Sequence, residues 1–150
     1  MKENKYYILT LGCQMNRNDS ERLSGFLSGF GLKMTEQPEE ADVLFINTCS
    51  VREHAEQRIF GFVHNWNKFR ENRPNLIIGI TGCLPGYDKN SKIKKRFEGV
   101  DLYFPIIDLP KLPEKLKQLN PELFPIEQNK QVNEYWEYAP MRQNLSLIHI

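Results

Sequence analysis

Three cysteines carry the clearest chemistry in this sequence of 150 residues. Cys13, Cys49 and Cys83 lie more than thirty residues apart, and each follows a short apolar run typical of a buried strand. In an open parallel α/β sheet the carboxyl ends of the strands converge on one crevice, so three distant thiols would meet in space. Three thiolates leave one iron of an iron–sulfur cluster free to bind an exogenous group. The spacing therefore predicts a three-cysteine iron–sulfur site at the edge of a sheet.

Other roles for the cysteines remain open at this point. Free cysteine is among the most buried residue types, so all three could pack as small apolar side chains. A zinc site would need a fourth donor, and the nearest candidate in the sequence is His54. The odd number of cysteines argues against a disulfide scaffold. The residues around Gly12 lack the G-x-G-x-x-G spacing of a dinucleotide-binding loop.

Alternating strand and helix patterns surround the cysteines. Apolar runs predict three buried strands at 5–11, 43–47 and 76–81. Capping-box patterns predict that helices begin near Asn18, with Glu21, and near Ser50, with Glu53; glycines 29 and 31 end the first helix. Smaller expected elements are an edge strand at 32–35, a turn at 37–40, a polar loop at 85–90, a short amphipathic helix at 93–97, a strand at 100–104 and a last helix carrying Leu116 and Leu119. The expected fold class is α/β: a doubly wound, mostly parallel sheet with helices on both faces, Rossmann- or flavodoxin-like.

We expect one domain at 1–120, followed by an extended linker at 121–144 that carries the aromatic cluster Tyr135, Trp136 and Tyr138. Residues 145–150 are expected to be a non-native tail, because they match one reading frame of a transposon-derived sequencing adapter. Apolar runs are too short for a signal-peptide core or a membrane span, which predicts a cytoplasmic protein without a membrane partner. With a formal net charge of +1, any contact with RNA would depend on local patches such as Lys92, Lys94, Lys95 and Arg96.

The cysteine motifs resemble those of one known family. They read Gly12-Cys13-Gln14-Met15-Asn16, Asn47-Thr48-Cys49-Ser50-Val51-Arg52-Glu53 and Gly82-Cys83, with Asp19-Ser20-Glu21 and Ala41-Asp42-Val43 between them. This set is similar to the N-terminal domain of the radical S-adenosylmethionine methylthiotransferases, and it resembles the MiaB branch, which modifies tRNA. The resemblance runs from about Lys5 to Leu119.

The resemblance implies that Cys13, Cys49 and Cys83 hold an auxiliary 4Fe–4S cluster whose open iron takes the sulfur donor or methylsulfide. It implies for the full-length enzyme a second 4Fe–4S cluster, S-adenosylmethionine, and tRNA as substrate, with a methylthio group added to C2 of N6-isopentenyladenosine next to the anticodon. The family holds its second cluster with a Cys-x-x-x-Cys-x-x-Cys motif that this sequence lacks. We therefore expect this fragment, without the radical SAM and RNA-binding domains, to bind a cluster but not to catalyse.

Two further matters stay open. The resemblance leaves room for a methylthiotransferase acting on another adenosine or on a ribosomal protein, and the residues alone also fit a non-catalytic docking module or an electron-transfer protein. No catalytic residue is assigned. Asn16, Asn47 and Arg52 are candidates for lining the cluster pocket, without an assigned role.

Overall fold

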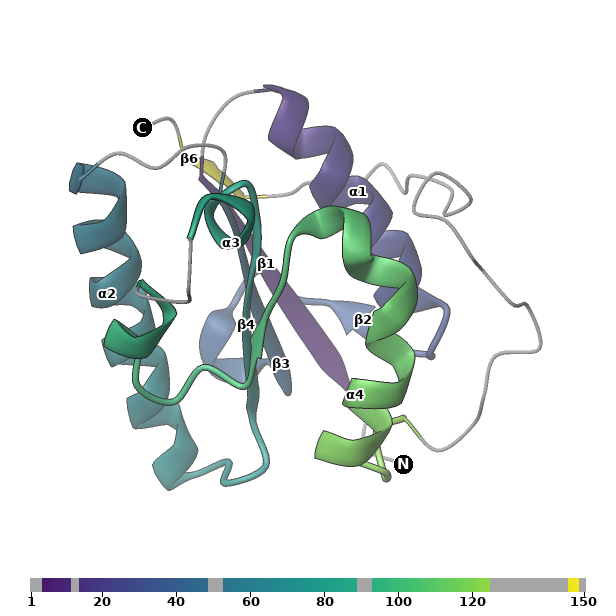
Figure 1. Cartoon of the computed structure of the whole chain (residues 1–150). Helices are drawn as coiled ribbons and strands as arrows, with labels where there is room; N and C mark the ends of the chain where they lie inside the picture. The colour runs from purple at the N-terminus through teal and green to yellow at the C-terminus, as the bar shows by residue number, and fades with distance from the viewer. Residues whose placement is uncertain (1–3, 12–13, 49–52, 89–92, 125–145, 149–150) are drawn as a thin grey trace.

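The architecture is a parallel sheet between two layers of helices (Figure 1). The computed structural model describes residues 4–11, 14–48, 53–88, 93–124 and 146–148, without the side chains of 14–16, 53–56, 86–87 and 146–148. Its five main strands are ordered β2-β1-β3-β4-β5, and their neighbours pair in parallel. They span Lys5–Leu11 (β1), Lys33–Met34 (β2), Val43–Thr48 (β3), Ile77–Gly82 (β4) and Leu102–Tyr103 (β5). The predicted α/β fold class is confirmed.

Two hydrophobic cores lie on opposite faces of this sheet. Helices α1 (Gln14–Ser28) and α4 (Leu112–Leu119) cover one face, and α2 (Glu53–Lys68) covers the other (Figure 1). Because side chains alternate along a strand, Phe45 of β3 enters the α1/α4 core while its neighbour Ile46 enters the α2 core. The central strands are therefore apolar at nearly every position, as strands buried on both faces must be.

Helix α1 begins earlier than the sequence predicts. The capping-box prediction at Asn18 and Glu21 is wrong, because the helix already begins at Gln14 and both residues lie within it. Glu21 is only 8% exposed, and its Oε1 lies 3.7 Å from Nε of Arg17, one turn earlier. The predicted end is confirmed: α1 ends at Ser28, and Gly31 has a φ of +86°.

The second half of the chain contains more short helices than expected. Helix α3 (Leu84–Tyr87) replaces part of the predicted polar loop, because Leu84 is buried and anchors a turn there. The predicted amphipathic helix is a 3₁₀ turn, η4 (Lys94–Arg96), and another 3₁₀ segment, η5 (Ile106–Lys111), precedes α4. The remaining 3₁₀ turns are η1 (Pro38–Glu40) and η2 (Phe69–Glu71).

The core beside α4 extends past the end of that helix. Leu116 is buried as predicted, but Leu119 is 43% exposed. Leu123 and Phe124 are buried instead, and the Phe124 ring lies edge-on to Phe30 with 5.0 Å between centroids. Packing against the α1/α4 core thus continues to residue 124.

A short strand near the end of the chain completes the sheet. Strand β6 (Ser146–Ile148) pairs in parallel with β1 at Leu9–Leu11, whereas β2 pairs with β1 at Lys5 and Tyr6. The expected linker, with Tyr135, Trp136 and Tyr138, lies outside the described residues, and the non-native origin of 145–150 stays a prediction. No helix in the described part of the chain is long and apolar enough to cross a membrane.

Candidate functional site

The three central strands end side by side. Leu11 at the end of β1 pairs with Thr48 at the end of β3, and Thr48 pairs with Gly82 at the end of β4. Parallel neighbours lie about 4.8 Å apart, so the three ends span only about 10 Å. In the sequence Cys13 follows Leu11 by two residues, and Cys49 and Cys83 directly follow Thr48 and Gly82. The predicted convergence is thus confirmed for the strand ends.

Of the three predicted ligands, the structure describes Cys83. This residue is exposed, lies at the N-cap of α3, and donates its backbone N–H to the carbonyl oxygen of Thr48 at 2.9 Å. Cys13, Cys49 and Arg52 lie outside the described residues, as do the side chains of Asn16 and His54. Within the described part of the chain no three His, Cys, Asp or Glu side chains gather to hold a metal ion. The ligand set Cys13, Cys49 and Cys83 therefore stays a prediction.

Gly82 holds the ends of β3 and β4 close together. Its φ is +104°, and a Cβ at this position would lie 2.1 Å from the carbonyl oxygen of Thr48 and 2.6 Å from Oδ1 of Asn47. Only glycine combines that backbone conformation with such a close approach. A glycine before a ligand cysteine is also expected to leave room for a cluster; the described contacts show that this one makes room for β3.

A row of buried polar side chains lies directly beneath this edge. Thr10, Asn47 and Thr81 are register partners on β1, β3 and β4, and all three are fully buried. Ser20 of α1 joins the first two: its hydroxyl lies 2.7 Å from Oγ1 of Thr10 and accepts Nδ2 of Asn47 at 2.9 Å. Thr10 and Asn47 lie two residues after Ile8 and Phe45, so they face the same α1/α4 core. Polar side chains therefore replace apolar ones at the end of this core where the strands lead into the cysteines.

Two threonine hydroxyls next to Cys83 differ in their partners. Oγ1 of Thr48 accepts the amide of Leu84 at 3.3 Å and donates to the carbonyl oxygen of Thr81 at 3.4 Å, which fixes the start of α3. Oγ1 of Thr81 is buried and has no partner among the described residues. An unpaired buried hydroxyl costs about 1–3 kcal/mol, so its retention indicates that another group meets this edge. Hydroxyl donors suit sulfur ligands and cluster sulfides, and in this respect the residues present fit an iron–sulfur cluster.

Three helices begin at the same edge. Helix α1 begins right after Cys13, α3 right after Cys83, and α2 four residues after Cys49. The first amides of a helix lack partners within the helix and favour negative charge nearby. This edge of the sheet therefore favours negative charge, such as that of a thiolate.

Comparison with known proteins assigns the family. The model of "Uncharacterized protein family UPF0004" matches residues 5–105, about two thirds of the chain. The chain belongs to this UPF0004 family. Its relatives include proteins named tRNA-2-methylthio-N(6)-dimethylallyladenosine synthase, from Carboxydothermus hydrogenoformans (38% identical over 91% of this chain and 30% of the relative), Thermoanaerobacter sp. (40%, over 95% and 31%) and Haemophilus influenzae (43%, over 77% and 24%).

These matches confirm the resemblance expected from the cysteine motifs. The UPF0004 match spans the three central strands and the loops with all three cysteines. The chain covers less than a third of the length of these relatives.

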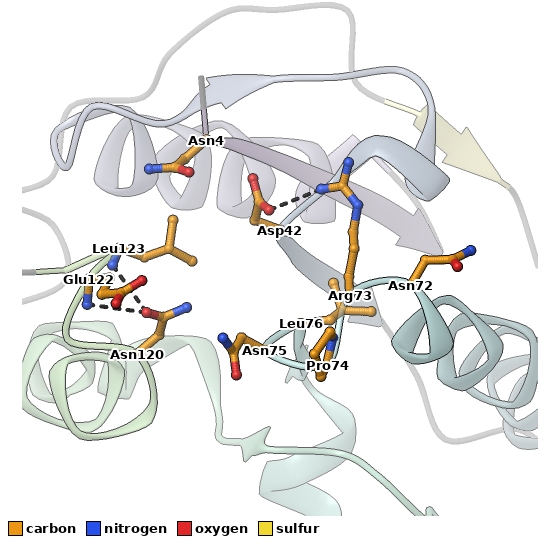
Figure 2. A pocket seen from close by; sticks show the side chains of 10 residues that line it. All are labelled: Asn4, Asp42, Asn72, Arg73, Pro74, Asn75, Leu76, Asn120, Glu122 and Leu123. Atoms are coloured by element: carbon orange, nitrogen blue, oxygen red, sulfur yellow. Dashed lines mark hydrogen bonds and ion pairs between the residues drawn. The ribbon is translucent and has the colours of Figure 1, made fainter. Parts of the chain in front are cut away.

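The opposite edge of the UPF0004 domain holds a polar pocket of about 400 Å³ (Figure 2). Arg73 and Asp42 form an ion pair at 2.9 Å on one side of it, and Oδ1 of Asn120 accepts the amides of Glu122 and Leu123 on another. Asp42 also accepts the backbone N–H of Lys5 at 3.0 Å. Asp42 thus ties the start of β1 to the turn before β4, and Asn120 holds the turn after α4, which indicates a structural role for these groups.

Proposed function

We propose that this domain holds a 4Fe–4S cluster through Cys13, Cys49 and Cys83, with one iron left open. The observation that supports this best is the shared register of Leu11, Thr48 and Gly82, which brings together the ends of the three strands that precede the cysteines. When bound, the cluster would supply an open iron that takes up sulfur for transfer. The sequence offers no obvious fourth ligand, and this favours sulfur handling over simple electron transfer.

The surrounding residues would hold and shield that cluster. Thr48 fixes the turn into α3 and receives the amide of Cys83, so it orients the third ligand. The Thr10–Ser20–Asn47 network keeps water from the inner side of the edge, because all of its members are fully buried. A rigid sheet beneath the ligands provides the positional accuracy that a metal site requires.

For the full-length protein we propose a cytoplasmic radical S-adenosylmethionine methylthiotransferase. Its relatives' printed name supports tRNA as the substrate and 2-methylthiolation of a dimethylallyladenosine as the reaction. A second 4Fe–4S cluster and S-adenosylmethionine would generate the radical in a domain that this chain does not contain. The chain alone would bind the auxiliary cluster and produce no deoxyadenosine from S-adenosylmethionine. Deoxyadenosine formed by the purified chain would contradict this division.

Anaerobic reconstitution of Cys83→Ala tests the cluster proposal most sharply. Cys83 is exposed and its side chain caps no helix amide, so its loss should change the free energy of unfolding by less than about 0.5 kcal/mol. We expect wild type to take up iron and sulfide in equal amounts and to turn brown, and the variant to lose most of both. Gln118→Ala, on the exposed side of α4, is the control and should load like wild type. Equal iron in wild type and Cys83→Ala would refute the proposal.

A further inference from the structure

One flank of the domain is positively charged although the chain as a whole is nearly neutral. We call it the basic flank and define it by four exposed residues of α2 and η4: Lys68, Lys94, Lys95 and Arg96. The two elements are packed together, since the rings of Phe60 and Phe97 lie 4.4 Å apart and Nδ2 of Asn67 donates to the carbonyl of Glu98 at 2.8 Å. In Figure 1 the flank follows α2, on the side of the sheet away from α1 and α4.

Three cations of the basic flank have no acidic partner within the described part of the chain. Residues 57–70 contain no Asp or Glu. Lys68, Lys94 and Lys95 form no ion pair with any described residue. The one carboxylate that lines the neighbouring pocket is that of Glu98. An excess of cations therefore faces solvent along this flank.

One nearby carboxylate holds η4 in place. Asp88 accepts the amides of Ile93 and Lys94, both at 2.8 Å, and the hydroxyl of Tyr103 at 2.9 Å. Asp101 accepts Arg70 at 2.5 Å and the amide of Ile78 at 3.0 Å, so it joins η2 to β4 instead. Asp88 therefore builds the turn that presents Lys94 and Lys95.

A concave site with an aromatic wall lies in the middle of the flank. It encloses about 480 Å³ and is lined by Phe60, His64 and Arg96 among others. The Arg96 guanidinium lies over the Phe60 ring, 5.0 Å from its centroid. A guanidinium can stack on a base or donate to a phosphate, whereas a lysine offers only a point charge.

η4 is held against the end of the helix that follows Cys83. Asp88, at the C-cap of α3, accepts the amides of Ile93 and Lys94 at 2.8 Å. An RNA strand on this flank would therefore pass beside the element that carries a proposed ligand.

We propose that the basic flank binds the phosphate backbone of RNA, with the Arg96–Phe60 site receiving one nucleotide. The choice of RNA over an acidic protein rests on the proposed function and on this stacked site. Lysines on a plain solvated surface would lack the neighbouring arginine–aromatic contact and the hollow beside it. The surface would help to seat the substrate of the full-length enzyme.

Binding of a fluorescent tRNA to this chain, measured by anisotropy over a range of salt concentrations, tests the proposal. The variant is Lys94→Gln/Lys95→Gln, and the matched control is Lys115→Gln/Lys117→Gln on the exposed side of α4. Both remove two positive charges and touch no buried group. We expect roughly tenfold weaker binding for the flank variant, and a fall of about 1.4 in the slope of log K against log salt, since each single-strand phosphate contact adds about 0.7. The control should bind within about twofold of wild type.

Three results would overturn the proposal. An equal loss of tRNA affinity in both variants would show that binding depends on net charge alone. Equal affinity in wild type and both variants would show that the basic flank does not contact the RNA. Competition by polyglutamate as strong as competition by an RNA of equal charge would show a general polyanion surface. Iron content is measured on the same preparations, because cluster binding does not depend on the basic flank. If the protein takes up iron but the flank variant and the control bind RNA equally well, this inference is refuted and the cluster proposal is not affected.

Discussion

Replacing Gly82 by alanine tests the geometry at the cysteine edge. A methyl group there would meet the carbonyl oxygen of Thr48 at 2.1 Å and its backbone nitrogen at 2.7 Å, neither of which can rotate away. Strands β3 and β4 would have to separate where the loops with Cys49 and Cys83 leave the sheet. We expect Gly82→Ala to lower both stability and iron uptake.

The magnitude follows from two contributions. A left-handed backbone costs an alanine about 1–2 kcal/mol. Forcing a methyl into a packed site typically costs a further 1–3 kcal/mol or so. The sum, about 3 kcal/mol at its centre, is within the roughly 5–15 kcal/mol that stabilises a typical domain, so the variant should still fold. At an m-value of about 1.5 kcal/mol/M its urea midpoint would fall by about 2 M.

Two other glycines separate the contributions. Gly31 has a φ of +86° with nothing within 4 Å of the position that a Cβ would take, so Gly31→Ala should show the backbone cost alone, about 1–2 kcal/mol. Gly61 lies in α2 with open space around it, and Gly61→Ala should raise stability by about 1 kcal/mol. Urea unfolding, followed by circular dichroism, gives the unfolding midpoint of each variant and therefore ranks the three by stability. A Gly82→Ala midpoint equal to that of Gly31→Ala would refute the close contact with β3.

Three further substitutions probe buried or bridging polar groups by the same urea assay. Thr81→Val should raise the free energy of unfolding of the iron-free protein by about 1 kcal/mol, because it removes a buried hydroxyl that has no partner among the described residues; a loss would reveal such a partner. Tyr6→Phe should lower it by about 1 kcal/mol, since its buried hydroxyl bonds to two serines of α1 at 2.5 and 3.0 Å, and an unchanged midpoint would show that these bonds contribute nothing. Arg73→Met breaks the half-buried pair with Asp42 and should cost about 1 kcal/mol or less, a loss that shrinks in 1 M salt if it is electrostatic.

The sequence predicted the central sheet closely. β1 has the predicted bounds, and β3 and β4 differ from the predicted strands by no more than one residue at either end. Their continuous apolar runs reflect burial on both faces, which is the strongest signal that a parallel strand can give. The convergence of the strand ends that precede the cysteines followed from the same logic, since parallel strands that pair in register end at one edge.

The start of α1 and the buried polar row were not predicted, for a common reason. The Asn18–Glu21 spacing suits a cap but equally suits the interior of a helix, and only the packing of α1 on the sheet decides between them. That packing also buries Thr10 and Ser20, which in the sequence look like ordinary polar residues near a loop. The alternation from Ile8 to Thr10 and from Phe45 to Asn47 was the available signal, because residues two apart on a strand share a face.

The position of β3 has a consequence for hydrogen exchange. All six of its residues pair with β1 on one side and with β4 on the other, and both of its faces are buried. The edge strands β2 and β5 pair over two residues each, so they can open locally while β3 stays intact. Its amides should therefore exchange only when the whole domain unfolds, and they should be the slowest in the chain. The residue that follows this strand, Cys49, is thus attached to the part of the protein that opens last.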